Sequence, residues 1–138
     1  MSDLVYGIED VQVCAQTALG EARSEGEGGM SAVLHVIVNR CRDRRWPNTP
    51  AKVARQRKQF SCWNQADWNL ANLHRMIHAD FSDPLYRQAF YLAAKILAGL
   101  DSDITYGANH YQVTGTNAYW ARGKQSVVSV GKHQFYIL

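Results

Sequence analysis

A glutamate at position 21 lies where a helix-forming segment gives way to glycines, within the stretch Leu19–Met30. A carboxyl group at the end of a buried helix is held away from water, keeps its proton near neutral pH and can donate it to a leaving oxygen. On residue type alone, Glu21 is more often a solvent-exposed surface glutamate than a buried catalytic acid. Glu25 lies one helical turn beyond Glu21 and could share its face, and Glu27 follows among the glycines.

Cleavage of a glycosidic bond is the chemistry that such an acid suits. Most glycosidases add a second carboxylate, and the binding of a sugar chain needs aromatic platforms with amide or hydroxyl donors. A single aromatic residue is more often part of a core. Here the aromatic residues are grouped with amides and a hydroxyl in the non-helical segments, and this grouping indicates a carbohydrate site. The residues concerned are Trp46, Trp63, Trp68, Trp120, Tyr106, Tyr111 and Tyr119, with Asn39, Gln59, Ser61, Asn64 and Asn109.

Metal and thiol chemistry have weaker support. His74 and His78 have the i,i+4 spacing of two zinc ligands on one helix, but no third ligand is evident, so no metal and no cofactor is predicted. A Cys–His hydrolase built on Cys62 and His110 lacks an orienting third residue. The three cysteines (Cys14, Cys41 and Cys62) lack CxxC spacing and are expected to be reduced, buried thiols.

The composition is that of an ordinary globular chain. Its 138 residues suit a single domain over residues 1–138, and 46% of them are hydrophobic. The sequence contains no run of 18 apolar residues, so no membrane span is predicted. The first residues lack the basic and apolar regions of a secretory signal, which favours synthesis and folding in a cytoplasm.

Positive charge is concentrated in the middle of the chain. The net charge is +3, and eight of the 15 basic residues fall between positions 40 and 58. Such a cluster favours an anionic partner, although a solvated surface explains it equally well. Nothing resembling a nucleic-acid recognition motif accompanies it. The eight residues are Arg40, Arg42, Arg44, Arg45, Lys52, Arg55, Arg57 and Lys58.

The N-terminal two-thirds of the chain reads as helical. Helices are predicted over Asp10–Gly20, over Met30–Arg42, after Thr49-Pro50, over Ala66–His78 and from Asp83-Pro84 onward. The apolar positions expected to be buried include Leu70, Met76, Ile77, Phe90, Ile96 and Leu100.

The character of the chain changes after Gly99. Short strands are predicted at Val127–Val130 and Gln134–Leu138, around a turn at Gly131-Lys132. The predicted fold class is α+β and mainly α, with a helical core and a small β or irregular C-terminal part.

Taken in order, these segments resemble the SleB-like cell wall hydrolase family, which includes spore-cortex-lytic enzymes and several phage lysis proteins. The resemblance covers the chain from about residue 14 to its end, and eight segments carry it. They are Leu19–Gly26, Gly29–Val33, Val36–Arg40, Trp46–Thr49, Gln59–Trp63, Gly107–Tyr111, Trp120-Ala121 and Gly131–Tyr136.

The resemblance implies a lysozyme-like domain that cleaves peptidoglycan glycan strands as a lytic transglycosylase. Its catalytic glutamate matches Glu21, which would act first as acid and then as base, without a second carboxylate. Asn39 and Arg40 would hold the exit of their helix against the catalytic turn. The candidate substrate-binding residues are Ser61, Phe60, Trp63, His110, Tyr111, Trp120 and Glu25.

The resemblance also favours a phage branch of the family, because His110 replaces the aromatic residue of the spore type. Leu19 is a further departure from the usual pattern. The expected protein is a monomeric endolysin that needs a holin to reach the periplasmic wall, with no membrane insertion and no nucleic-acid partner. A hydrolytic muramidase remains an alternative, in which Glu25 or Glu27 activates water positioned by Ser61. A non-catalytic wall-binding module is an alternative of another class.

Overall fold

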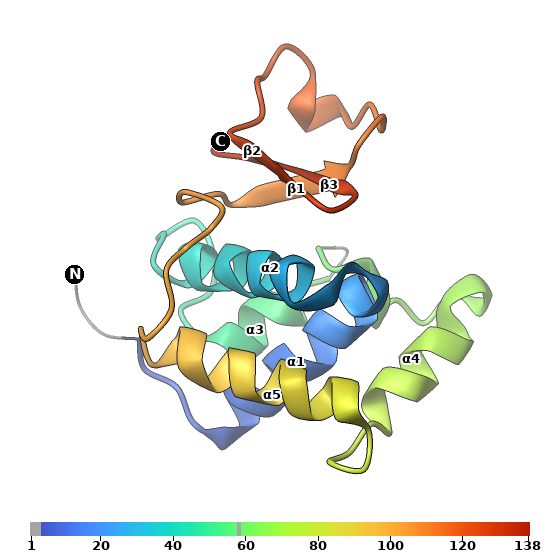
Figure 1. Cartoon of the computed structure of the whole chain (residues 1–138). Coiled ribbons are helices and arrows are strands. Elements are labelled where there is room, and N and C mark those ends of the chain that lie inside the picture. Colours follow the sequence, from blue (N-terminus) through green and yellow to red (C-terminus); the bar gives the residue numbers. More distant parts are fainter. Residues whose placement is uncertain (1–3, 58) are drawn as a thin grey trace.

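Helix α1 (Ile8–Ala22) is the centre of a helical layer (Figure 1). The computed structural model describes residues 4–57 and 59–138. Most side chains of α1 from Val11 to Leu19 are buried, because α1 contacts helices α2 (Gly26–Cys41), α3 (Pro50–Ala54), α4 (Leu70–Ile77) and α5 (Pro84–Leu97). The hydrophobic core therefore lies around α1, between α2 and α5.

Helix ends differ from the prediction in a way that affects Glu21. Helix α1 begins after Gly7, whose backbone N–H donates to Asp10, and it continues to Ala22, so Glu21 lies within the last turn rather than after it. A short 3-10 helix, η1 (Arg23–Glu25), follows. Of the three glycines that follow Glu21 (Gly26, Gly28 and Gly29), only Gly26 adopts a positive φ, of 73°, and the other two lie inside α2. A single glycine is enough to redirect the chain here.

The apolar pattern predicted burial better on α5, where Ile96 is buried and Phe90 is half-buried, than on α4. Asp83 caps α5 by accepting from the N–H of Leu85, as the Asp83-Pro84 pair predicts. The predicted helix over Ala66–His78 is instead a 3-10 turn, η3 (Asp67–Asn69), followed by α4. Met76 is buried, whereas Leu70, Ile77 and Leu100 are exposed, contrary to the prediction.

A three-stranded antiparallel sheet lies over α2 at the C-terminal end of the chain (Figure 1). Its strands are β1 (His110–Val113), β2 (Val128–Val130) and β3 (His133–Tyr136), in the order β1-β3-β2. The predicted strands correspond to β2 and β3, and β1 was missed. The α+β, mainly α class is confirmed.

Polar contacts join the sheet to the helices. The Asn39 amide donates to the Ala108 carbonyl at 2.9 Å, and Glu25 accepts from the N–H of Lys132 at 2.8 Å and lies 3.4 Å from His133 Nδ1. Gly131 forms the β2–β3 turn at φ 56°, and a Cβ there would lie 2.6 Å from the Glu25 carboxylate. Glycine is required at this turn for both reasons.

Among the described residues, no helix combines the length and the apolar character needed to cross a bilayer.

Candidate active site

The close approach of a second segment to α1 positions Glu21. Gly20 packs against Cys62 and Met76, and a Cβ at Gly20 would lie 2.6 Å from the Cβ of Cys62. Because glycine leaves this space open, the 3-10 helix η2 (Ser61–Trp63) lies directly against the last turn of α1. The backbone N–H of Cys62 thereby reaches the Glu21 carboxylate.

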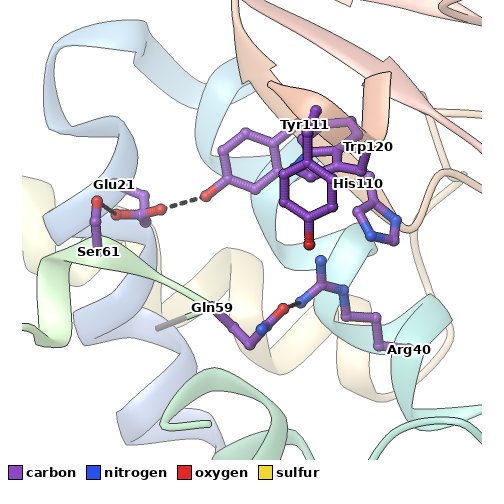
Figure 2. Close-up of a pocket in the computed structure, with 8 residues that line it drawn as sticks. Glu21, Arg40, Gln59, Ser61, His110, Tyr111 and Trp120 are labelled. Carbon is purple, nitrogen blue, oxygen red and sulfur yellow. Dashed lines mark hydrogen bonds between the residues drawn. The ribbon is translucent and has the colours of Figure 1, made fainter. Parts of the chain in front are cut away.

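Three donors hold the two oxygens of Glu21. Oε2 accepts from the Cys62 N–H at 3.1 Å. Oε2 also accepts from the Ser61 hydroxyl at 3.4 Å, and Oε1 accepts from the Tyr111 hydroxyl (Figure 2). The peptide N–H can only donate, whereas both hydroxyls can rotate to donate or accept. Glu21 is therefore fixed in position while its neighbours can accommodate both the protonated and the ionised carboxyl group.

Tyr111 comes from β1 and is held by aromatic contacts. Its ring lies 5.2 Å from that of His133, 5.5 Å from Phe135 and 6.2 Å from Phe60, measured between centroids. Burial, together with the Glu21 charge, raises the pKa of the Tyr111 phenol well above its usual value. The phenol consequently stays protonated and remains a donor to Glu21.

A cavity of about 430 Å³ opens beside this carboxylate (Figure 2). Glu21 is the only carboxylate among the described residues that line it. The lining residues are Glu21, Arg40, Gln59, Ser61, His110, Tyr111, Tyr119 and Trp120. Of the predicted site residues, the structure thus brings Ser61, His110, Tyr111 and Trp120 together with Glu21.

Arg40 forms the wall opposite Glu21 in Figure 2. The sequence placed Arg40 in an exposed basic cluster, but the residue is only 5% exposed. Its Nε donates to the Asn109 carbonyl at 2.8 Å, which ties the end of α2 to the residue before β1 rather than to the turn after Glu21. Burial lowers the pKa of Arg40 to about 10, so the guanidinium remains charged at neutral pH.

The rest of the predicted basic cluster is less uniform than its sequence suggests. Arg45 pairs with Asp43 at 2.8 Å and Arg55 pairs with Glu9 at 3.1 Å, while Arg42 and Arg44 are exposed. Lys58 lies outside the described residues. Partial pairing reduces the net field of the cluster.

His110 contributes a neutral ring to the cavity. Burial and the charges of Arg40 and Arg45 lower its pKa to about 4. Nδ1 lies 2.8 Å from Asn109 Oδ1, an oxygen that can only accept, so this contact favours a proton on Nδ1 and leaves Nε2 as an acceptor. The ring contacts Trp120 at 4.9 Å and Trp46 at 5.8 Å between centroids.

Three predicted substrate-binding residues do not line this cavity. Phe60 is buried in the core beneath it, and Trp63 donates to the Thr17 hydroxyl at 2.9 Å and faces a different hollow. The Glu25 carboxylate is 5% exposed and holds the β2–β3 turn. Glu25 therefore attaches the sheet, because its Oε1 accepts from the Lys132 N–H and lies 3.4 Å from His133 Nδ1.

The structure also adds residues that were not assigned to substrate. Arg40, Gln59 and Tyr119 line the cavity. Gln59 and Tyr119 belonged to the group of amides and aromatics that indicated a carbohydrate site. The sequence assigned Arg40 only to the exit of its helix. Its burial beside the cavity marks it as a site residue, and the sequence does not reveal that burial.

Neither the thiols nor the histidines suggest another site. Burial and the Glu21 charge raise the pKa of Cys62 far above its usual value, which keeps it a thiol rather than the thiolate that a Cys–His hydrolase needs. His74 and His78 have ring centroids 4.3 Å apart. Across residues 4–57 and 59–138, no group of three or more His, Cys, Asp or Glu side chains is placed to hold a metal ion.

The sequence profile of the Cell Wall Hydrolase family matches residues 24–136. The chain belongs to this family. It is therefore an enzyme of cell wall degradation. The match begins three residues after Glu21, so the case for Glu21 depends on the geometry described above. No curated protein matches the chain in sequence.

Two solved structures share the fold of this cell wall hydrolase. One is the catalytic domain of the germination-specific lytic transglycosylase SleB from Bacillus anthracis, with 23% identity, a TM-score of 0.72 and coverage of 95% of this chain and 96% of that one. The other is the catalytic domain of the Bacillus cereus SleB protein, with 23% identity, a TM-score of 0.71 and coverage of 96% and 92%.

Proposed function

We propose that this cell wall hydrolase cleaves the MurNAc–GlcNAc bond of peptidoglycan as a lytic transglycosylase, with Glu21 as the catalytic residue. The observation that carries the proposal is that Glu21, held by three donors, is the single carboxylate among the described residues that line the cavity. Hydrolysis by two carboxylates needs a second one within about 5–9.5 Å. The SleB domain of B. anthracis, which has this fold, is itself described as a lytic transglycosylase.

The reaction needs one group that acts twice. Glu21 in its acid form donates its proton to the glycosidic oxygen, the bond from that oxygen to C1 of MurNAc breaks, and GlcNAc leaves with a free 4-hydroxyl. The Glu21 carboxylate then removes the proton from the 6-hydroxyl of the same MurNAc. Oxygen 6 bonds to C1 and closes a 1,6-anhydro ring, so no water is consumed and Glu21 regains its proton.

The donors around Glu21 support both halves of this cycle. The Cys62 N–H keeps Oε2 in place, and the rotating hydroxyls of Tyr111 and Ser61 follow the movement of the proton. The fixed Cys62 N–H is a preorganised donor, and such a donor stabilises charge without having to move during the reaction.

Product analysis of digested peptidoglycan tests the proposal. Mass spectrometry of muropeptides should show anhydro ends, each lighter by one water than a reducing end, and Glu21→Gln should form none while retaining the thermal stability of the parent. Reducing ends alone would assign the protein as a hydrolytic muramidase with Ser61 positioning water. A folded Glu21→Gln variant as active as the parent would overturn the catalytic assignment and favour a wall-binding module.

We further propose that the protein is a monomeric phage endolysin that reaches the periplasmic wall through a holin. The support is the resemblance of the sequence to the phage branch at His110 and the exposed arginines Arg42 and Arg44, which suit an anionic envelope. Expression in a bacterial cytoplasm should lyse the cells only when a holin is produced with it. Lysis without the holin would contradict this route.

A further inference from the structure

The buried cation at Arg40 has no acidic partner among the described residues. We propose that Arg40 binds a carboxylate of the glycan strand while Glu21 acts on the glycosidic bond across the same cavity, so that the enzyme selects strands carrying that carboxylate. This inference rests on the proposed function and specifies the substrate that it takes.

The hydrogen bonds of Arg40 leave part of its guanidinium available. Nε donates to the Asn109 carbonyl at 2.8 Å, and Nη1 donates to Gln59 Oε1 at 3.1 Å. Both acceptors are neutral. Within the described part of the chain, Nη2 donates to no acceptor. It is not fully buried either, because the only fully buried side-chain N or O atom without a partner there is Gln56 Oε1. The N–H groups of Nη2 are therefore accessible from the cavity that Arg40 lines.

Aromatic rings fix the plane of this guanidinium. The central carbon of Arg40 lies 5.1 Å from the centroid of Trp46 and 5.4 Å from that of Phe60. Stacked rings and two hydrogen bonds together hold the side chain in one orientation. An arginine fixed in this way can receive a carboxylate with little loss of conformational entropy.

The charge balance of the cavity points to an anionic ligand. A buried charge without a partner is costly to a fold, and Arg40 stays charged despite its burial. The other charged group of the lining, Glu21, is already held by three donors. His110 is neutral at neutral pH. A carboxylate is the planar anion that matches the guanidinium fork.

Peptidoglycan offers that group from two sources. The lactyl substituent of MurNAc ends in a carboxylate when no stem peptide is attached and in a neutral amide when one is. The stem peptide carries carboxylates of its own. Both sources present the same chemistry to Arg40, and they can be separated with prepared substrates.

The test compares kcat/KM on two pairs of strands. One pair is strands stripped of stems by an amidase, with the lactyl carboxylate free or methyl-esterified. The other pair is intact strands, with the stem carboxylates free or methyl-esterified. The parent should prefer the free form in one pair by about tenfold, the value of a strong charge-assisted hydrogen bond. That pair identifies the source of the carboxylate.

Variants assign the preference to Arg40. Arg40→Gln should reduce the ratio to about one, and Arg40→Lys should keep part of it. Arg45→Gln is the matched control, because Arg45 also lies over Trp46, at 4.6 Å, but is exposed and does not line the cavity. It should keep the ratio of the parent. A ratio within one preparation cancels the fraction of folded enzyme, so loss of stability does not affect the result.

Absence of a preference in the parent, or a preference that survives in Arg40→Gln, would overturn the inference. Both outcomes leave the proposed function intact as long as strands are cleaved. Failure of the parent to cleave any of the four strands would instead contradict the proposed function itself.

Discussion

Replacement of Tyr111 by phenylalanine tests whether the hydroxyl of β1 positions the catalytic carboxyl group. The change removes the donor to Glu21 Oε1 and keeps the ring that packs between Phe60, His133 and Phe135. A hydrogen bond to a charged group contributes about 1.5–3 kcal/mol. Because Glu21 is half-buried beside an open cavity, water can replace part of this bond, which favours the lower end.

A loss of about 1.5 kcal/mol in the transition state corresponds to roughly a tenfold fall in kcat. KM should change little, because the sugar-facing surface of the ring remains. Initial rates of anhydro-end formation from purified strands give both constants. Tyr86→Phe is the matched control, since Tyr86 is a buried tyrosine on α5 that does not line the cavity, and it should keep the kcat of the parent.

An unchanged kcat in Tyr111→Phe would refute the positioning role of the hydroxyl. A fall in melting temperature with an unchanged kcat would show that the hydroxyl serves the fold rather than the reaction. A rise in KM alone would place Tyr111 in ground-state binding instead.

Two further predictions concern the frame of the site. Gly20→Ala should lower the free energy of unfolding by about 1–3 kcal/mol, because the new Cβ would lie 2.6 Å from the Cβ of Cys62 and 2.7 Å from the Met76 sulfur. Urea unfolding measures this loss. Gly7→Ala is the control, because a Cβ at Gly7 would have no atom within 4 Å, and it should not lose stability through overpacking. The second prediction concerns pH: since the pKa of His110 is lowered from 6.5 to about 4, the unfolded chain binds a proton here that the folded chain does not. The contribution of His110 to stability should therefore be complete above pH 6.5 and be lost as the pH falls toward 4. Between pH 6.5 and 4, the free energy of unfolding, measured in urea, should fall less steeply with decreasing pH in His110→Phe than in the parent. An equally steep fall in the variant would show that other groups cause the pH dependence.

The sequence predicted those parts of the fold that depend on local signals. Asp83-Pro84 located the start of α5, and the Gly131-Lys132 turn located β2 and β3. Strand β1 was missed because the alternation in His-Tyr-Gln-Val spans only four residues, and glycine, asparagine and threonine residues surround it.

Burial on α4 was predicted wrongly for a different reason. The spacing of Leu70 and Ile77 is typical of a buried helical face, but these two residues remain 47% and 44% exposed. Periodicity reports which residues share a face, and packing decides whether that face is enclosed.

The candidate site could be predicted as a set of residue types but not as an arrangement. Glu21 lies 41 residues from Cys62 and 90 from Tyr111 along the chain, so no local pattern relates them. The same limit explains Arg40, whose burial depends on Asn109, 69 residues away. Only the folded chain distinguishes Arg40 from the exposed arginines near it in sequence.

The attachment of the sheet to the helical layer also sets the order in which activity can arise. Helices α1 and α2 form from local contacts, whereas the hydroxyl that holds Glu21 belongs to β1, which pairs with β3. During synthesis the acid is therefore made long before the wall of its cavity. A ribosome-bound chain that has not yet reached β3 carries Glu21 but cannot complete the site, so the site becomes competent only after β3 has emerged and folded.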